Sequence, residues 1–203
     1  MTMSTPNRRA HRCVVAQRGF TLIEILVTFA VMAILLGLAA PSFIAFQRNS
    51  ELTSTANSFL SALSVARAEA MKRQLNALVV PIRDNDWSGG WRVYVDVNGN
   101  SSYEASADIL VTEQRELPAT VLPSIGPGAD GFSDGSHLYA MFVGSGFMRL
   151  ANGSFKSSAL DFKSSYTDER RRIIANPAGR LRVCNPGNAS HPADPGCNAT
   201  DPI

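Results

Sequence analysis

An acidic side chain interrupts the most apolar stretch of the chain. Glu24 follows Leu22 and Ile23, and the next charged residue is Arg48. A carboxylate in apolar surroundings is costly unless it meets a cation, and inside a membrane such a residue marks a functional position by default. The chemistry that Glu24 offers is therefore ion pairing with a partner from outside the stretch, and we predict no catalytic role for it.

Positive charge gathers toward the C-terminus. Residues 20–146 carry seven basic and twelve acidic side chains, whereas residues 147–203 carry eight basic and five acidic ones. Most of these cations are arginines, whose planar guanidinium suits phosphate better than the lysine ammonium does. The cations considered for a phosphate-binding patch are Lys156, Lys163, Arg170, Arg171, Arg172, Arg180 and Arg182.

The arginines form two clusters, which are predicted to lie on neighbouring strands. The segment Asn-Pro-Ala-Gly at 176–179 favours a turn, and this turn would place the triplet 170–172 beside Arg180 and Arg182. Alternate residues of a strand point to the same face, which groups Arg180 with Arg182. The ordinary interpretation is a solvated strand face, and the sharper one is a surface that binds nucleic acid.

The sequence contains no pattern typical of a metal centre, a cofactor site or an enzyme. Asp96, Asn98 and Asn100 have the spacing that opens a calcium loop, but Ser101 and Ala107 stand where that loop needs glycine and a bidentate acid. A two-residue Asn-Gly hairpin turn beginning at Asn98 explains the same segment without a metal. We therefore predict no metal, no cofactor and no enzymatic activity.

Two cysteines remain near the C-terminus. Cys184 and Cys197 form an even pair, whereas Cys13 lies before the apolar stretch. A zinc site would need two further ligands, and only His191 is close in sequence. In an oxidising compartment the pair is predicted to form a disulfide that closes a loop of about a dozen residues.

The first half of the chain supplies the segments that must position these side chains. Residues 1–19 contain four arginines and no acid, and residues 20–46 are long and apolar enough to cross a bilayer as a helix. By the positive-inside rule the N-terminus is then cytoplasmic and everything after the helix is periplasmic. A secretory signal peptide and an uncleaved signal anchor are the alternatives for the same residues.

Residues 47–76 are predicted to continue the helix in amphipathic form. Apolar residues recur at alternating spacings of four and three, which lines one helix face. Pro41 is expected to bend the helix without ending it, and two separate helices are the alternative. The apolar face consists of Leu52, Ala56, Phe59, Leu63, Ala66 and Ala70.

Residues 77–203 are predicted to form a β-rich domain with a disulfide-closed tail. Pro81 confines its strand to an edge or creates a bulge. The predicted fold class is α+β, a long N-terminal helix packed against an antiparallel sheet. The predicted strands are 77–83, 91–97, 109–113, 137–143, 147–150, 160–162, 172–175 and 180–184.

The junction Arg18-Gly-Phe-Thr-Leu-Ile-Glu24 resembles the class III signal of type IV pilins and type II secretion pseudopilins. In that family a prepilin peptidase cuts after the glycine and methylates the new N-terminus, which implies cleavage between Gly19 and Phe20. The resemblance makes Glu24 the fifth residue of the mature chain. Its expected partner is the amino group of Phe20 on a neighbouring subunit, and this pairing would fix axial register in a filament.

The whole chain looks like the FimT/GspH group of minor pilins. The resemblance lies in the segment Trp-x-Val-Tyr-Val-Asp-x-Asn-Gly at 91–99 and in the Gly-Arg-x-Arg strand at 179–182. In FimT-type members the latter is associated with DNA binding during natural transformation. Gly179, Arg180 and Arg182 are therefore expected DNA contacts.

The resemblance also sets the expected partners and location. They are other pilins, prepilin peptidase, the inner membrane and weakly, non-specifically bound DNA, with the mature chain moving from a single-pass membrane position into a pilus. A GspH-type pseudopilin of type II secretion, which has protein partners only, is the first alternative. A membrane-anchored periplasmic domain that never polymerises is the second.

Overall fold

The computed structural model describes residues 19–83, 85–188 and 191–197. The chain divides into two compact units, Met1–Phe43 and Ile44–Ile203, and the helix α1 (Leu22–Arg73) contributes to both. Residues 1–18 of the predicted leader lie outside the described residues. The helix is continuous through Pro41, in agreement with the expectation that this proline does not end it.

In the first unit the apolar side chains of α1 are uncovered. Phe20 and Leu22 are each 78% exposed, and Phe29 is 64% exposed. Among the described residues no single straight helical segment meets the length and hydropathy needed to span a membrane. Leu22–Gly37 and Ser42–Arg73 meet them when taken together.

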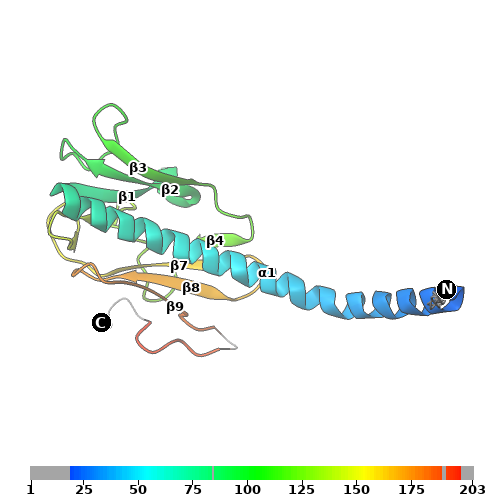
Figure 1. Ribbon diagram of the computed structural model, residues 1–203. Helices are drawn as coiled ribbons and strands as arrows, with labels where there is room; N and C mark the ends of the chain where they lie inside the picture. Colours follow the sequence, from blue (N-terminus) through cyan, green and yellow to red (C-terminus); the bar gives the residue numbers. More distant parts are fainter. Residues whose placement is uncertain (1–18, 84, 189–190, 198–203) are drawn as a thin grey trace, which may run out of the picture. The chain divides into compact units, whose positions relative to one another are not determined.

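In the second unit α1 buries the amphipathic face that its periodicity predicts. All six of these side chains are fully buried, which confirms the prediction; they are Leu52, Ala56, Phe59, Leu63, Ala66 and Ala70. Figure 1 shows this part of α1 running between the strands β1–β3 and the strands β7–β9, so that one helix covers both.

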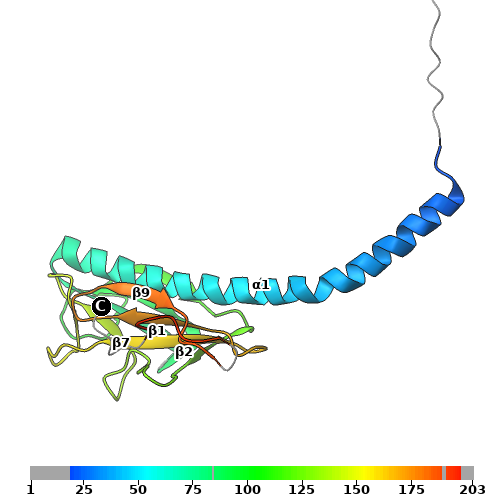
Figure 2. The same ribbon diagram turned by 90° about the horizontal axis from the view of Figure 1, so that it is seen from below.

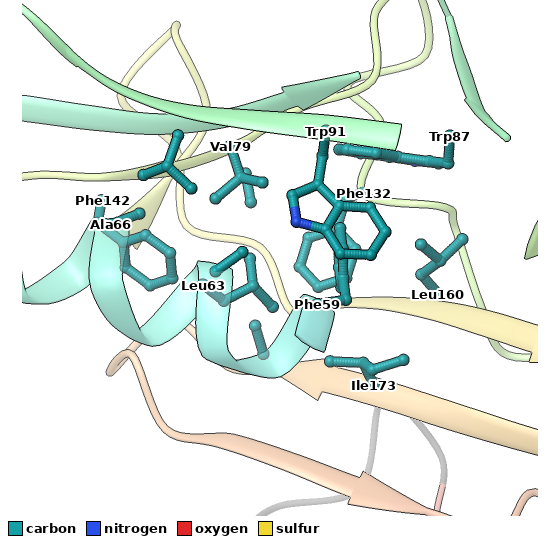
Figure 3. Packing of buried hydrophobic residues seen from close by; sticks show 14 of the residues in the cluster. Phe59, Leu63, Ala66, Val79, Trp87, Trp91, Phe132, Phe142, Leu160 and Ile173 are labelled. Atoms are coloured by element: carbon teal, nitrogen blue, oxygen red, sulfur yellow. The ribbon is translucent and has the colours of Figure 1, made fainter. Parts of the chain in front are cut away.

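Phe59 is the centre of the core. Its ring makes edge-to-face contacts with Trp91, Trp87, Phe132 and Phe162, at centroid distances of 5.0, 5.2, 5.6 and 5.7 Å. Figure 3 shows the rings of Phe59, Trp87, Trp91 and Phe132 near aliphatic side chains of both sheets, such as Val79 and Leu160. Because aromatic side chains bury large apolar areas and these contact α1 and two sheets, the cluster joins all three layers.

The strands form two antiparallel sheets, where the sequence predicted one. The first has five strands in the order β3-β2-β1-β5-β6, and the second has four in the order β4-β7-β8-β9. Figure 2 shows β9, β1 and β7 on the same side of α1. The strands are β1 (Asn76–Arg83), β2 (Asp86–Asp96), β3 (Ile109–Arg115), β4 (Val121–Ser124), β5 (Ala140–Phe142), β6 (Met148–Arg149), β7 (Ser158–Ser164), β8 (Arg170–Ala175) and β9 (Leu181–Cys184).

Two of the strands differ from the predictions for physical reasons. β2 begins five residues before the predicted start, at Asp86, because Trp87 packs on Phe59 and belongs to the core. β4 was not predicted, since it is short and contains Pro123. A proline suits its position at the edge of the second sheet. Pro81 lies at an irregularity of register, as expected, although its strand β1 is internal.

The Asn-Gly hairpin prediction was wrong. Residues 97–108 join β2 to β3, and buried acids hold this longer loop in place. Asp96 accepts hydrogen bonds from the backbone N–H groups of Gly99, Asn100 and Ser101. Asp108 accepts two more backbone hydrogen bonds at the other end of the loop. These hydrogen bonds stabilise the longer loop more than a tight turn at Asn98 and Gly99 would be stabilised by local preference.

The described part of the C-terminal tail folds back on the second sheet. The predicted disulfide joins Cys184 to Cys197, with their Cα atoms 5.8 Å apart. Both cysteines pack with Ala159 and Ile174 in a small buried cluster. This cluster lies on the face of β7 and β8 opposite the one that contacts α1, because successive residues of a strand alternate between faces. The tail therefore covers the outer face of the second sheet.

Candidate functional site

The predicted processing segment lies at the start of α1. Gly19 is exposed and precedes the helix, and a Cβ atom added there would have no neighbour within 4 Å. Thr21 begins the helix, since its Oγ1 accepts a hydrogen bond from the N–H of Glu24 at 3.3 Å. Thr21 and Glu24 have the spacing of a capping box, so the acid also suits the positive end of the helix dipole.

The second candidate site is the hairpin between β8 and β9. Its turn matches the prediction: Gly179 N–H donates to the carbonyl of Asn176, and Asn176 Oδ1 accepts from the N–H of Arg180. Arg180 is exposed, and its guanidinium has no hydrogen-bond or ion-pair partner among the residues that the structure describes. The tip of this hairpin thus presents one uncommitted cation to solvent.

Gly179 has a structural reason to be glycine. Its φ is +76°, which is left-handed, and an added Cβ would overlap the carbonyl oxygen of Gly146 and lie 2.7 Å from Arg67 Nε. Arg67, on α1, donates from Nε to the carbonyl of Gly146 at 3.0 Å and from Nη2 to that of Ala178 at 3.3 Å. The helix therefore holds the turn that carries Arg180. Sequence reasoning missed Arg67, because its link to the turn is purely tertiary.

We expect Gly179→Ala to lower the free energy of unfolding by about 2 kcal/mol or more, since it combines a left-handed alanine with a backbone overlap. Gly153→Ala is the matched control: its φ is +83°, but nothing lies within 4 Å of an added Cβ. Thermal unfolding of the two variants in the same detergent measures the difference. Equal melting temperatures would show that the close approach of Gly146 costs nothing.

Arg172 is not part of an accessible patch, which corrects the sequence-based prediction. It is 2% exposed and makes a bidentate pair with Asp161: Nε lies 2.6 Å from Oδ1 and Nη2 lies 2.8 Å from Oδ2. Its guanidinium also donates to the carbonyls of Pro127 and Cys197. Every nitrogen of this side chain has a partner within the chain, so none is left for phosphate.

The other predicted cations are dispersed. Lys156 pairs with Asp130 at 2.8 Å and donates to the carbonyl of Ser133, which corrects its assignment to the patch. Arg171 faces α1, where its Nη2 donates to Asn49 Oδ1 at 3.0 Å. Each of these side chains is held by a partner distant in sequence, which the sequence did not indicate.

Lys163 and Arg170 lie opposite each other on β7 and β8. In the register of β8 and β9, Ile174 stands opposite Arg182, so Arg180 is level with position 176. Arg170 is therefore about six residues further along the hairpin, or about 20 Å away at 3.3 Å per residue. Arg170 and Arg180 thus lie at opposite ends of the hairpin, and the two arginine clusters do not form the single small surface that the sequence predicted.

Arg182 is half-buried and differs from Arg180. It lies on the outer face of the sheet with Arg172, beneath the tail, where an added Cβ on Gly196 would be 3.4 Å from its terminal nitrogens. Its Nε and Nη2 atoms are buried and have no hydrogen-bond partner among the described residues. The two arginines of the Gly-Arg-x-Arg segment thus have unequal access to a ligand.

Two family models match this sequence. One is described as the prokaryotic N-terminal methylation motif and matches residues 15–40. The other is described as the type II transport protein GspH and matches residues 55–190. The chain belongs to the GspH family. Its fold agrees, since an N-terminal helix packs on antiparallel sheets, as the FimT/GspH resemblance predicted.

This GspH-family chain is similar to proteins described as pilin-like, and it spans less than two thirds of the curated relative that it matches. The pilin-like protein PilA1 of Thermus thermophilus is 32% identical over 96 residues, which is 47% of this chain and 59% of that protein. The type IV minor pilin FimU of Pseudomonas aeruginosa has a crystal structure similar over 75% of this chain and 98% of its own, with 19% identity and a TM-score of 0.50. The minor pseudopilin EpsH of Vibrio cholerae covers 68% of this chain and 99% of its own, with 17% identity and a TM-score of 0.46.

Proposed function

We propose that this chain is a minor pilin of a type IV pilus that binds DNA for uptake. Prepilin peptidase cuts it between Gly19 and Phe20, and the mature chain enters a filament through the first half of α1. The uncovered apolar side chains of that segment support this proposal, since burying them in a bilayer or among other pilin helices removes them from water.

Glu24 is the assembly residue in this proposal. A carboxylate in a bundle of apolar helices needs a cation, and processing creates one at the amino group of Phe20. The acid of one subunit then meets the N-terminus of the next, which fixes the axial register between them. The basic leader before residue 20 favours a cytoplasmic N-terminus and a periplasmic domain before assembly.

The DNA-binding part of the proposal rests on Arg180. It is an exposed guanidinium with no partner among the described residues, on a turn that Gly179 and Arg67 hold in place. A rigid turn presents the cation without ordering a loop on binding, which lowers the entropic cost of a phosphate contact. Arg182 assists from beneath the tail, while Lys163 and Arg170 form a second, more distant pair.

We expect the full processed chain, in phosphatidylcholine nanodiscs, to bind a labelled duplex with a Kd on the order of 10 µM or weaker at low salt. With about two phosphate contacts, the logarithmic salt slope should be near two. Arg180→Gln should weaken binding several-fold and reduce this slope by about one. Fluorescence anisotropy at several salt concentrations measures both quantities.

Arg115→Gln is the matched control, because it removes the same charge from an arginine that is 85% exposed on the other sheet. It should leave affinity nearly unchanged. Equal losses in the two variants would mean that only net charge matters. No binding by the unmutated chain would favour the alternative, a pseudopilin of a secretion system with protein partners only, for which the GspH family model is the supporting observation.

A further inference from the structure

A pocket opens on the outer face of the first sheet, away from α1. Its lining includes Tyr94 on β2 and Tyr139 just before β5, and these two tyrosines belong to a buried cluster with Leu78 and Met141. These residues alternate along their strands with those that contact α1, so they face the opposite way. The pocket has a volume of about 730 Å³, and the 97–108 loop, which folds back over the sheet, supplies one wall through Tyr103.

Arg92 lies in this pocket without an anion. Its guanidinium stacks over the ring of Tyr103, with Cζ 4.6 Å from the ring centre. Among the described residues it has no hydrogen bond and no ion pair, and its Nε is buried. Stacking fixes the guanidinium plane and leaves its hydrogen-bond donors unused.

Tyr94 adds a second unused donor. Its side chain is fully buried, its ring lies 5.2 Å from that of Tyr103, and its hydroxyl has no hydrogen-bond partner among the described residues. Burial is the main cause that raises the pKa of Tyr94 above its usual value, so the hydroxyl stays protonated and able to donate. A buried hydroxyl without a partner destabilises the free chain, and a bound acceptor would remove this cost.

The nearby acids do not supply the missing partner of Arg92 or of Tyr94. Asp134 accepts hydrogen bonds from the backbone N–H groups of Ser136 and His137, which lower the pKa of its carboxyl. Glu113 stands opposite Arg92 in the register of β2 and β3, but its Oε1 lies 2.7 Å from Nε of Arg115 and forms an ion pair with that residue. The pocket thus combines an aromatic wall, an unpaired cation and an unpaired hydroxyl.

We propose that this pocket binds a carboxylate carried on an apolar or aromatic body. Arg92 pairs with the carboxylate, the hydroxyl of Tyr94 donates a hydrogen bond to it, and the rings of Tyr103 and Tyr139 contact the body. The carboxylate comes either from the C-terminal end of a polypeptide or from a small organic acid. The site is independent of Arg180 and of DNA.

The tyrosines provide the test, because the chain has four and three of them line the pocket. The fourth, Tyr166, is 60% exposed and stacks with Arg48 elsewhere. In the full chain labelled with 3-fluorotyrosine, N-acetylphenylalanine should shift the ¹⁹F resonances of Tyr94, Tyr103 and Tyr139. It should leave that of Tyr166 in place. Equal shifts of all four would overturn the proposal.

Two variants separate binding from folding. Arg92→Gln should weaken binding about tenfold, because a charge-assisted hydrogen bond is lost. Arg149→Gln is its matched control, since Arg149 stacks on Phe155 at 4.4 Å outside the pocket. Tyr94→Phe should weaken binding about threefold while leaving the melting temperature equal or higher, because its hydroxyl makes no bond in the free chain. A variant Tyr94→Phe that binds as tightly as the parent would refute the assigned role.

The probes distinguish the source of the carboxylate. N-acetylphenylalanine amide has the same body without the charge, and binding as tight as that of the acid would overturn the proposal. Inorganic phosphate that binds as tightly would also overturn it, since the body would then contribute nothing. Tighter binding of N-acetylphenylalanine than of benzoate would identify a chain end, and the reverse order would identify a small organic acid.

Discussion

Cells that express Glu24→Gln are expected to insert and process the chain normally, yet sheared pili should contain none of it. Glutamine keeps the capping-box partner for Thr21 and removes only the charge, so helix initiation is preserved. Insertion depends on apolar side chains, whereas register between subunits depends in our proposal on the ion pair with Phe20. The measurement is the amount of the chain in pili relative to membranes, by immunoblot.

Two controls make this result specific. Intact-mass analysis of the membrane fraction should show loss of residues 1–19 and methylation in both parent and variant, and only where prepilin peptidase is active. Glu24→Asp keeps the charge on a shorter side chain and should restore partial incorporation. Recovery of Glu24→Gln in pili at the parental level would contradict the assembly role, and an unprocessed parent chain would contradict the cleavage site.

Asp161→Asn is expected to lower the free energy of unfolding by about 3–5 kcal/mol, because it leaves the buried Arg172 cation without its counter-ion. The side chains of Arg172 and Asp161 are 3% and 0% exposed, so solvent cannot compensate the charge. For a chain of this size the loss corresponds to a fall in melting temperature of about 6–20 °C. Thermal unfolding followed by near-ultraviolet circular dichroism measures it.

The paired replacement Asp161→Leu/Arg172→Met should recover part of this loss, because it removes both charges together. Recovery stays partial because the carbonyls of Pro127 and Cys197 lose a donor. The pair Arg83–Glu116, with side chains 63% and 81% exposed, is the comparison: Glu116→Gln should cost less than about 1 kcal/mol. A melting temperature for Asp161→Asn within a degree or two of that variant would refute the argument.

Local sequence patterns were sufficient to predict those features that depend on a single helix or on one pair of residues. The buried face of α1 follows from spacing alone, since a helix places residues three and four apart on one side. The disulfide needed only two cysteines and an oxidising compartment. The division of strands between two sheets was not predictable in this way, because it depends on how Phe59 and its aromatic partners fill the space around α1.

The predicted basic patch shows why the sequence alone could not distinguish accessible arginines from buried ones. Arg171 and Arg172 are neighbours in sequence, but strand alternation turns one toward α1 and the other toward Asp161. The tail that covers Arg172 and Arg182 follows β9, and its residue Cys197, which accepts a hydrogen bond from Arg172, lies 25 residues away from that arginine in sequence. The outer pocket was missed for the same reason, since Tyr103 reaches Arg92 only through a loop whose path Asp96 and Asp108 determine.

The strand β3 bears on the polymerisation that we propose for this chain. It forms an open edge of the first sheet, seven residues long, where an identical strand from another molecule could add and start an aggregate. The charges of Glu113 and Arg115 and the irregular register opposite Val93 discourage such pairing. In the proposed filament this edge is thereby kept out of the contacts between subunits, so that growth through α1 does not compete with sheet extension at β3.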